Sequence, residues 1–159
     1  MSKWCITTSS PEETEQIGRQ IGSLLSGGEI IELVSDLGGG KTTLTKGIAR
    51  GAGYEGIVSS PTFTISSVYK ATDVEIHHYD FYRIGQLGVL GDELQEVIDS
   101  SDTVSVIEWA GEAHSMLPTE RLIRIDLLLV ADNENARKLV VEVNEGMEHV
   151  LEGLEATPC

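Results

Sequence analysis

The eight residues SDLGGGKT at positions 35–42 have the types and spacing of a phosphate-binding loop. They satisfy the pattern G-x-x-x-x-G-K-[ST] except at its first position, where Ser35 replaces glycine. Glycines let successive backbone N–H groups turn around phosphate oxygens, and a helix that follows directly presents its positive end to the same anion. Lys41 would bring charge to the β and γ phosphates, and the Thr42 hydroxyl would ligate Mg²⁺. The motif therefore predicts a nucleoside triphosphate site.

A magnesium nucleotide also needs a carboxylate near Thr42, and Asp80 and Glu108 are the candidates. Each follows an apolar run typical of a strand, and the carboxyl ends of parallel strands meet at one edge of a sheet. The chain has 26 Asp and Glu residues, so a plain surface position is the alternative for either one. The pattern favours a functional role for both acids and leaves their division of labour open.

Three residues beside these acids have weaker chemical meanings. His77 and His78 precede Asp80, but neighbouring residues on a strand point to opposite faces and do not easily share one metal ion. We therefore interpret both histidines as mainly structural. Trp109 directly follows Glu108, and its ring either packs in the core or belongs to a lid or an interface.

The segments that must position these residues follow the order strand, loop, helix. Residues 29–34 (EIIELV) are a β-rich run, and residues 42–50 have the pattern of a helix. Further apolar runs at residues 57–58, 74–78 and 104–107 predict strands of a largely parallel sheet. We thus expect an α/β fold of the P-loop NTPase-like three-layer type, a mixed, mostly parallel sheet flanked by helices.

The two ends of the chain add a helix and a hairpin. Ser10, Pro11 and Glu13 form a capping box, which predicts a helix start. Residues 122–130 and 138–143 flank a polar connection and predict an antiparallel pair. Between these ends, the glycine-rich stretch 85–91 is either a mobile loop or an ordinary connection to a helix at residues 92–98.

Length and composition limit the class of protein. With 159 residues, we expect one domain, residues 1–159. Cys5 and Cys159 stand near opposite ends outside any ligand spacing, so we expect reduced thiols. No run of roughly 18 apolar residues and no signal peptide is present, which predicts a cytoplasmic protein without a membrane segment. The formal charge of −15 opposes contact with any phosphate backbone, so a partner would have to hold any RNA.

Positive charge is scarce around the predicted site. Phosphoryl transfer usually relies on added cations at the transition state, often an arginine. Residues 84–120 contain no Lys or Arg, and the candidates besides Lys41 are Arg83, Arg121, Arg124 and Arg137. The chain therefore looks poorly equipped to be a fast kinase on its own.

Four sequence blocks resemble one known family, the TsaE (YjeE) proteins of bacterial tRNA threonylcarbamoyladenosine biosynthesis. The blocks are DLGGGKTT at residues 36–43, SPTFT at 60–64, HYDFYR at 78–83 and IEW at 107–109. The resemblance covers essentially the whole chain. It implies a P-loop ATPase that binds ATP and Mg²⁺, is weak alone and is activated in a complex with the TsaB and TsaD proteins. In that complex TsaD transfers threonylcarbamoyl to the adenosine beside the anticodon.

The resemblance also implies a role for individual residues. The implied nucleotide contacts are Asp36, Leu37, Gly38, Gly39, Gly40, Lys41, Thr42 and Thr43. The implied magnesium ligands are Thr42 and Glu108, and the implied catalytic residues are Asp80, Glu108 and Lys41. The implied switch or partner-facing residues are Thr62, Tyr82, Arg83 and Trp109.

Other functions use the same loop. A small-molecule kinase is the main alternative, and it would need a basic acceptor pocket or an arginine lid, against which the cation-free stretch 84–120 weighs. A GTPase switch is disfavoured because no NKxD-type tetrapeptide is present. A third alternative is a scaffold in which the nucleotide only holds the structure together.

Overall fold

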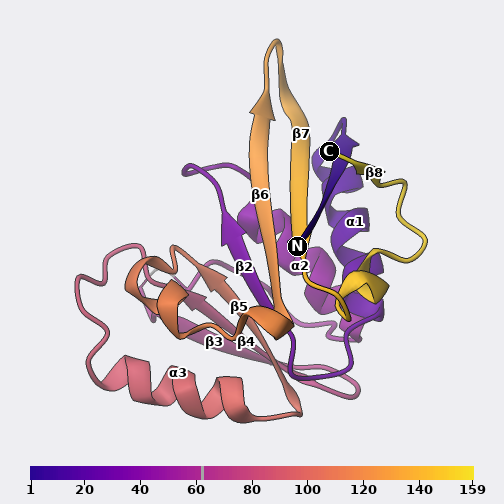
Figure 1. The fold of residues 1–159 in the computed structure, drawn as a ribbon. Coiled ribbons are helices and arrows are strands. Elements are labelled where there is room, and N and C mark those ends of the chain that lie inside the picture. The colour runs from indigo at the N-terminus through magenta and orange to yellow at the C-terminus, as the bar shows by residue number, and fades with distance from the viewer. Residues whose placement is uncertain (62) are drawn as a thin grey trace.

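A single eight-stranded sheet runs through the molecule in the computed structural model, which describes residues 1–61 and 63–159 (Figure 1). The strand order is β3-β4-β5-β2-β6-β7-β1-β8, and the four neighbours β4, β5, β2 and β6 run parallel. The strands are β1 (Ser2–Thr8), β2 (Ile30–Val34), β3 (Ser66–Lys70), β4 (Glu75–Asp80), β5 (Thr103–Glu108), β6 (Leu122–Val130), β7 (Asn133–Val143) and β8 (Thr157–Pro158).

In the described part of the chain, three α-helices accompany the sheet: α1 (Pro11–Ser23), α2 (Lys41–Ala52) and α3 (Val89–Asp99). Short 3₁₀ helices follow as η1 (Gly111–Met116), η2 (Thr119–Arg121) and η3 (Glu148–Leu151). The predicted cap of α1 is confirmed, because the Ser10 hydroxyl accepts from the Glu13 N–H at 3.2 Å. Within the described residues, no helix is both long and apolar enough to cross a bilayer.

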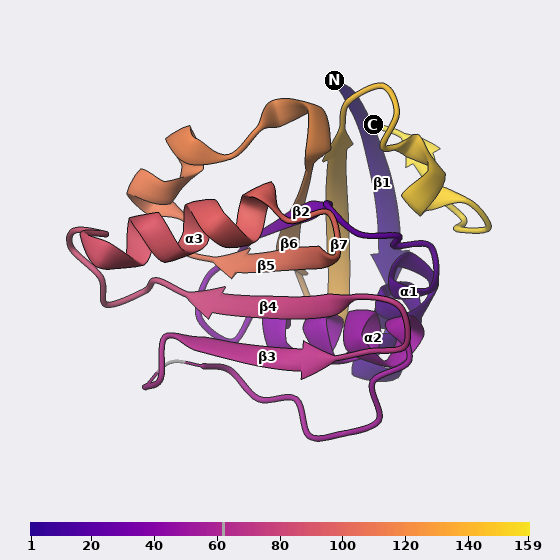
Figure 2. The same cartoon turned by 90° about the horizontal axis from the view of Figure 1, so that it is seen from below.

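Alternation along the strands divides the core into two layers. Ile31 and Leu33 of β2 face the cluster formed with α1 and α2, whereas Ile30 faces the cluster formed with α3. Figures 1 and 2 show α3 on one side of the sheet and the α1–α2 pair on the other. The predicted three-layer α/β fold with a largely parallel centre is confirmed.

Close packing of α1 against α2 fixes the helix that follows the glycine loop. A Cβ atom on Gly47 would lie 2.9 Å from the Cα of Gly18, a distance that real Cβ atoms essentially never show. The two glycines therefore let the helix backbones touch, and this contact holds α2 at the end of β2.

The predicted strand at residues 57–58 is wrong. The segment is irregular, and the Ile57 side chain is 86% exposed. Two adjacent apolar residues are too short a pattern to identify a strand, since a loop also exposes single apolar side chains. Two strands that the sequence patterns did not predict, β1 and β3, lie in the outer parts of the sheet. They are rich in polar residues, and their pairing with β7 and β4 defines them.

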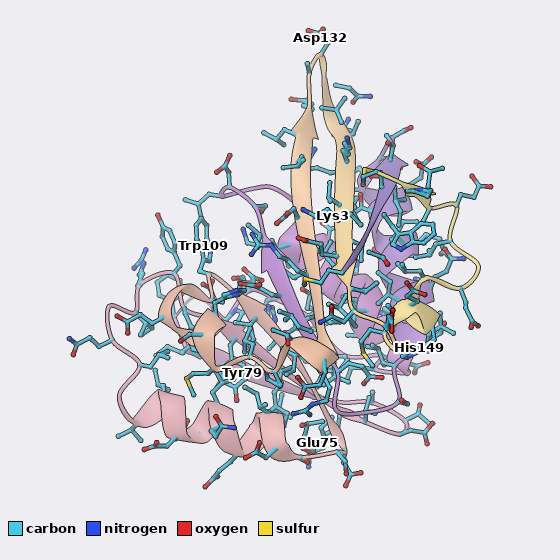
Figure 3. All side chains as sticks on the ribbon, viewed as in Figure 1. Lys3, Glu75, Tyr79, Trp109, Asp132 and His149 are labelled. Carbon is cyan, nitrogen blue, oxygen red and sulfur yellow. A yellow bond between two sulfur atoms is a disulfide. The ribbon has the colours of Figure 1, made fainter. Side chains whose placement is uncertain are left out.

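The predicted C-terminal hairpin is confirmed, with a shorter connection than expected. Strand β7 already begins at Asn133, so the polar stretch thought to be loop belongs to the ladder with β6. The turn contains Asp132, which has a left-handed φ of 65° and lies at the tip of the hairpin (Figure 3). The hairpin projects beyond the rest of the sheet (Figure 1).

The prediction of two reduced cysteines is also wrong, because Cys5 and Cys159 form a disulfide. Strand β1 lies between β7 and β8, and in this arrangement Cys5 is the register partner of Thr157. The two cysteines are 154 positions apart, and spacing rules for local motifs do not predict a bond between residues so distant in sequence.

Candidate functional site

A cavity of about 480 Å³ opens where the carboxyl ends of β4, β5 and β2 lie side by side. Its wall combines the glycine loop, the start of α2, both strand-end acids and an aromatic rim. The lining residues are Leu37, Gly38, Gly39, Gly40, Lys41, Thr42, Thr43, Ser60, Asp80, Tyr82, Arg83, Glu108 and Trp109. Ligands of parallel α/β sheets bind at this edge, outside the carboxyl ends of the strands.

The loop between β2 and α2 has the backbone of an anion site. Gly38 and Gly40 adopt left-handed φ angles of 73° and 103°, which only glycine adopts without strain. Gly40 is the N-cap of α2, and no side chain caps this helix. The first turn of α2 carries no acid, so its positive end is left for an anion supplied from the cavity.

Lys41 lies in the cavity wall with 6% of its surface exposed. Its ammonium donates to Ser35 Oγ at 2.9 Å and to the Asp36 carbonyl at 3.2 Å, and it lies 4.9 Å from the Trp109 ring centroid. Burial lowers the pKa of Lys41 below its ordinary value, and the charges of Glu108, Asp80 and Asp36 oppose that shift. The lysine is thus placed to exchange loop contacts for a phosphate oxygen.

Asp80 and Glu108 are register partners at the ends of the parallel strands β4 and β5. Both are buried, with 6% and 3% of their surface exposed. Asp80 accepts from the Tyr82 backbone N–H at 2.9 Å and from the Ser60 hydroxyl at 3.2 Å. The sheet therefore holds two acidic residues side by side in the wall of a cavity that Thr42 also lines.

Glu108 is held by a hydrogen-bonded chain that sequence reasoning missed. His78 Nε2 lies 2.8 Å from Glu108 Oε1, and His78 Nδ1 lies 3.1 Å from the Tyr69 hydroxyl. That hydroxyl lies 3.1 Å from the Ser59 carbonyl oxygen. His78 is fully buried, so the chain fixes the Glu108 carboxylate from behind the cavity.

Removing His78 is expected to destabilise the protein. His78→Ala would leave a cavity and a buried carboxylate without this partner, which should lower the free energy of unfolding by about 2–4 kcal/mol. His77 is the matched control, because it is the adjacent histidine and its polar contact is weaker: His77 Nε2 lies 3.4 Å from the carboxylate of Glu75, a partly exposed residue. Urea denaturation should give His77→Ala a loss of less than about 1 kcal/mol. Equal losses in the two variants would contradict the buried role of His78.

Aromatic side chains form the rim of the cavity. The rings of Tyr82 and Trp109, which line the cavity, are 4.9 Å apart, and Phe63, which is not a lining residue, has its ring centroid 5.7 Å from the Arg83 guanidinium. Tyr82 is 44% exposed and Phe63 is 89% exposed. Trp109 has a left-handed φ of 56°, an unusual conformation for a large side chain (Figure 3 labels it). The rim therefore presents apolar surface around a charged cavity.

The four candidate arginines are distributed unevenly. Arg83 lines the cavity, whereas Arg137 donates to the Gly39 carbonyl at 2.8 Å and so supports the loop from outside. Arg121 donates to backbone carbonyls near β2 and α3, and Arg124 pairs with Glu32 at 3.6 Å. The cavity wall thus brings Lys41 and Arg83 together with two acids.

The structure gathers most of the residues named from the sequence into this one wall. Asp36 is an exception, because its side chain is exposed and outside the lining, while its carbonyl contacts Lys41. Thr62 lies outside the described residues. Ser60 was missed as a site residue, although it belongs to the quoted SPTFT block, and its contact with Asp80 is the reason to add it.

Comparison with known proteins identifies the family. The family model described as "Threonylcarbamoyl adenosine biosynthesis protein TsaE" matches residues 8–139. The tRNA threonylcarbamoyladenosine biosynthesis protein TsaE of Bacillus subtilis is 39% identical over 124 residues, 76% of this chain and 73% of that protein. Its namesake from Streptomyces coelicolor is 36% identical over 132 residues, 79% of this chain and 87% of that protein. The crystal structure of Bacillus subtilis YdiB matches with a TM-score of 0.77 at 32% identity, covering 96% of this chain and 94% of that one. This chain therefore belongs to the TsaE family.

Proposed function

We propose that this chain is a cytoplasmic, single-domain ATPase that supports threonylcarbamoyladenosine modification of tRNA as a subunit of a complex with TsaB and TsaD. The observation that carries the proposal is the cavity, in which the glycine loop and Lys41 face the register-paired acids Asp80 and Glu108. The described relatives are named for the same modification, which supports its assignment to this chain.

In this proposal the loop binds the phosphates of ATP. The N–H groups at the start of α2 would donate to phosphate oxygens, and the Lys41 ammonium would move from the loop to the β and γ phosphates. Thr43 lines the same wall and would contact phosphate beside Thr42. Arg137 would keep the loop in shape, since it donates to the Gly39 carbonyl and is not among the residues that line the cavity.

The donor set in the cavity fits magnesium. Hydroxyl and carboxylate oxygens are the ligands that Mg²⁺ prefers, and it usually takes one or two carboxylates together with substrate phosphates. Thr42 and Glu108 would hold the ion, which would neutralise charge on the phosphates. Among the described residues no cluster of three or more His, Cys, Asp or Glu forms a metal site.

Asp80 is the residue best placed to act on the attacking water. The Tyr82 N–H and the Ser60 hydroxyl fix its carboxylate at the cavity. The side chain would therefore orient a water or accept its proton with little conformational rearrangement. Few cations face the γ-phosphate position, which makes slow turnover the expectation for the chain alone. A partner that binds the rim formed by Tyr82 and Trp109 would align the acids and accelerate hydrolysis.

Reconstituted tRNA modification tests the proposal. Purified TsaB and TsaD, with ATP, threonylcarbamoyl donor and tRNA, should give multiple turnovers only when this chain is added. We expect the chain itself to bind tRNA weakly, because its charge of −15 opposes contact with phosphates. Equal modification with and without the chain would show that the assigned role is wrong.

A further inference from the structure

The middle glycine of the loop has no backbone reason to be glycine. Gly38 and Gly40 have left-handed φ angles, but Gly39 does not. The phosphate-binding pattern also leaves this position open to any residue, since it fixes only the first glycine and the final G-K-[ST]. The absence of a side chain at position 39 therefore needs another explanation.

Ser35 supplies that explanation. A Cβ atom built on Gly39 would lie 2.6 Å from the Ser35 Cβ and 3.0 Å from the Asp36 carbonyl oxygen. The Ser35 Cβ is attached directly to the backbone at the end of β2, so it cannot rotate out of the way as the end of a long side chain would. A side chain at position 39 would therefore force Ser35 or the loop backbone to shift, at a cost in stability.

The Ser35 hydroxyl also holds the lysine of the loop. It donates to the Asp36 carbonyl at 2.8 Å and accepts from the Lys41 ammonium at 2.9 Å. The other acceptors of the ammonium are the Ser35 and Asp36 carbonyl oxygens, at 3.4 and 3.2 Å. A glycine at position 35 would keep the carbonyls and lose the shortest of these contacts.

We propose that Ser35 is a positioning residue that holds the Lys41 ammonium against the start of the loop until a phosphate replaces it, and that Gly39 is its obligatory partner. The first half rests on the proposed function, because it assumes that a nucleotide phosphate competes for the lysine. The second half concerns packing alone and holds for the nucleotide-free chain.

Competition for the lysine predicts that the hydroxyl weakens nucleotide binding. Ser35→Ala removes Oγ and keeps Cβ, so calorimetric titration with the non-hydrolysable analogue AMP-PNP and Mg²⁺ should show binding about three- to tenfold tighter. Ser23→Ala is the control, because the Ser23 hydroxyl also donates to a carbonyl, that of Gln20, far from the cavity. Unchanged or weaker binding by Ser35→Ala would overturn the lysine-holding role.

The packing half is tested without nucleotide. Gly39→Ala should lower the midpoint of thermal unfolding by about 3–8 °C in the wild-type and Ser35→Ala backgrounds, because both have a Cβ atom at position 35. In the Ser35→Gly background the same change should cost less than half as much, because only the tight contact with the Asp36 carbonyl oxygen remains. Gly85→Ala is the matched control, because Gly85 has open space around it and no left-handed φ. An equal cost of Gly39→Ala in all three backgrounds would refute the pairing, even if ATP binding proves as proposed.

Discussion

Replacing Lys41 by alanine is expected to weaken binding of ATP with Mg²⁺ by about 10- to 100-fold. A charge-assisted hydrogen bond contributes about 1.5–3 kcal/mol, and the cavity offers few other cations to compensate for its loss. The fold should persist, because the ammonium contacts a hydroxyl and carbonyl oxygens at the edge of the loop and the Trp109 ring at the cavity, and none of these contacts lies in the two core clusters. Calorimetric titration measures the affinity, and circular dichroism checks the fold.

Lys46→Ala provides the matched control for that experiment. Lys46 lies on the same helix α2, but it is exposed and pairs with Glu15 at 3.4 Å. Its removal should change nucleotide affinity less than about twofold, since an exposed ion pair contributes little. If Lys41→Ala binds ATP as tightly as Lys46→Ala, the loop is not the phosphate site.

Neutralising either strand-end acid is expected to lower ATP turnover in the complex with TsaB and TsaD by at least about 100-fold. Removal of a group that orients the nucleophile or organises charge at the transition state has effects of this size. Glu108→Gln and Asp80→Asn keep the shape of each side chain, so the loss would report on charge and proton acceptance. Steady-state phosphate release measures both variants.

The two variants should differ in their response to magnesium. Glu108→Gln should shift the Mg²⁺ concentration needed for nucleotide binding upward, whereas Asp80→Asn should bind normally and fail in hydrolysis. Asp126→Asn is the control, because Asp126 lies on the parallel strand β6, as the register partner of Val34 in β2, and outside the cavity wall. Normal turnover by both acid variants would remove Asp80 and Glu108 from the proposed chemistry.

Local signals were sufficient for the helix cap and for the glycine loop. The capping box at Ser10 and the glycine loop before α2 depend on contacts between near neighbours, so sequence spacing described them correctly. The positions of two acids at the ends of β4 and β5 were also predicted, because parallel strands bring their carboxyl ends to one edge of the sheet. The register that makes Asp80 and Glu108 direct partners required the structure.

Contacts between distant segments could not be predicted from one sequence. His78 was judged structural because strand alternation separates it from His77, but its contact with Glu108 depends on how β4 pairs with β5. The disulfide of Cys5 depends on β1 and the C-terminal strand β8 lying side by side. The clash that a side chain at position 39 would make with Ser35 depends on the three-dimensional path of the loop.

The central claim is that ATP hydrolysis in this cavity is slow alone and is activated by partners, and steady-state turnover tests it most directly. Phosphate release should be measured for the purified chain alone, with TsaB and TsaD, and with small hydroxylated acceptors. We expect slow release by the chain alone and a clear increase when both proteins are added. Turnover of about 1–100 per second by the chain alone, unchanged by TsaB and TsaD, would contradict it, as would activity that appears only with a hydroxylated acceptor.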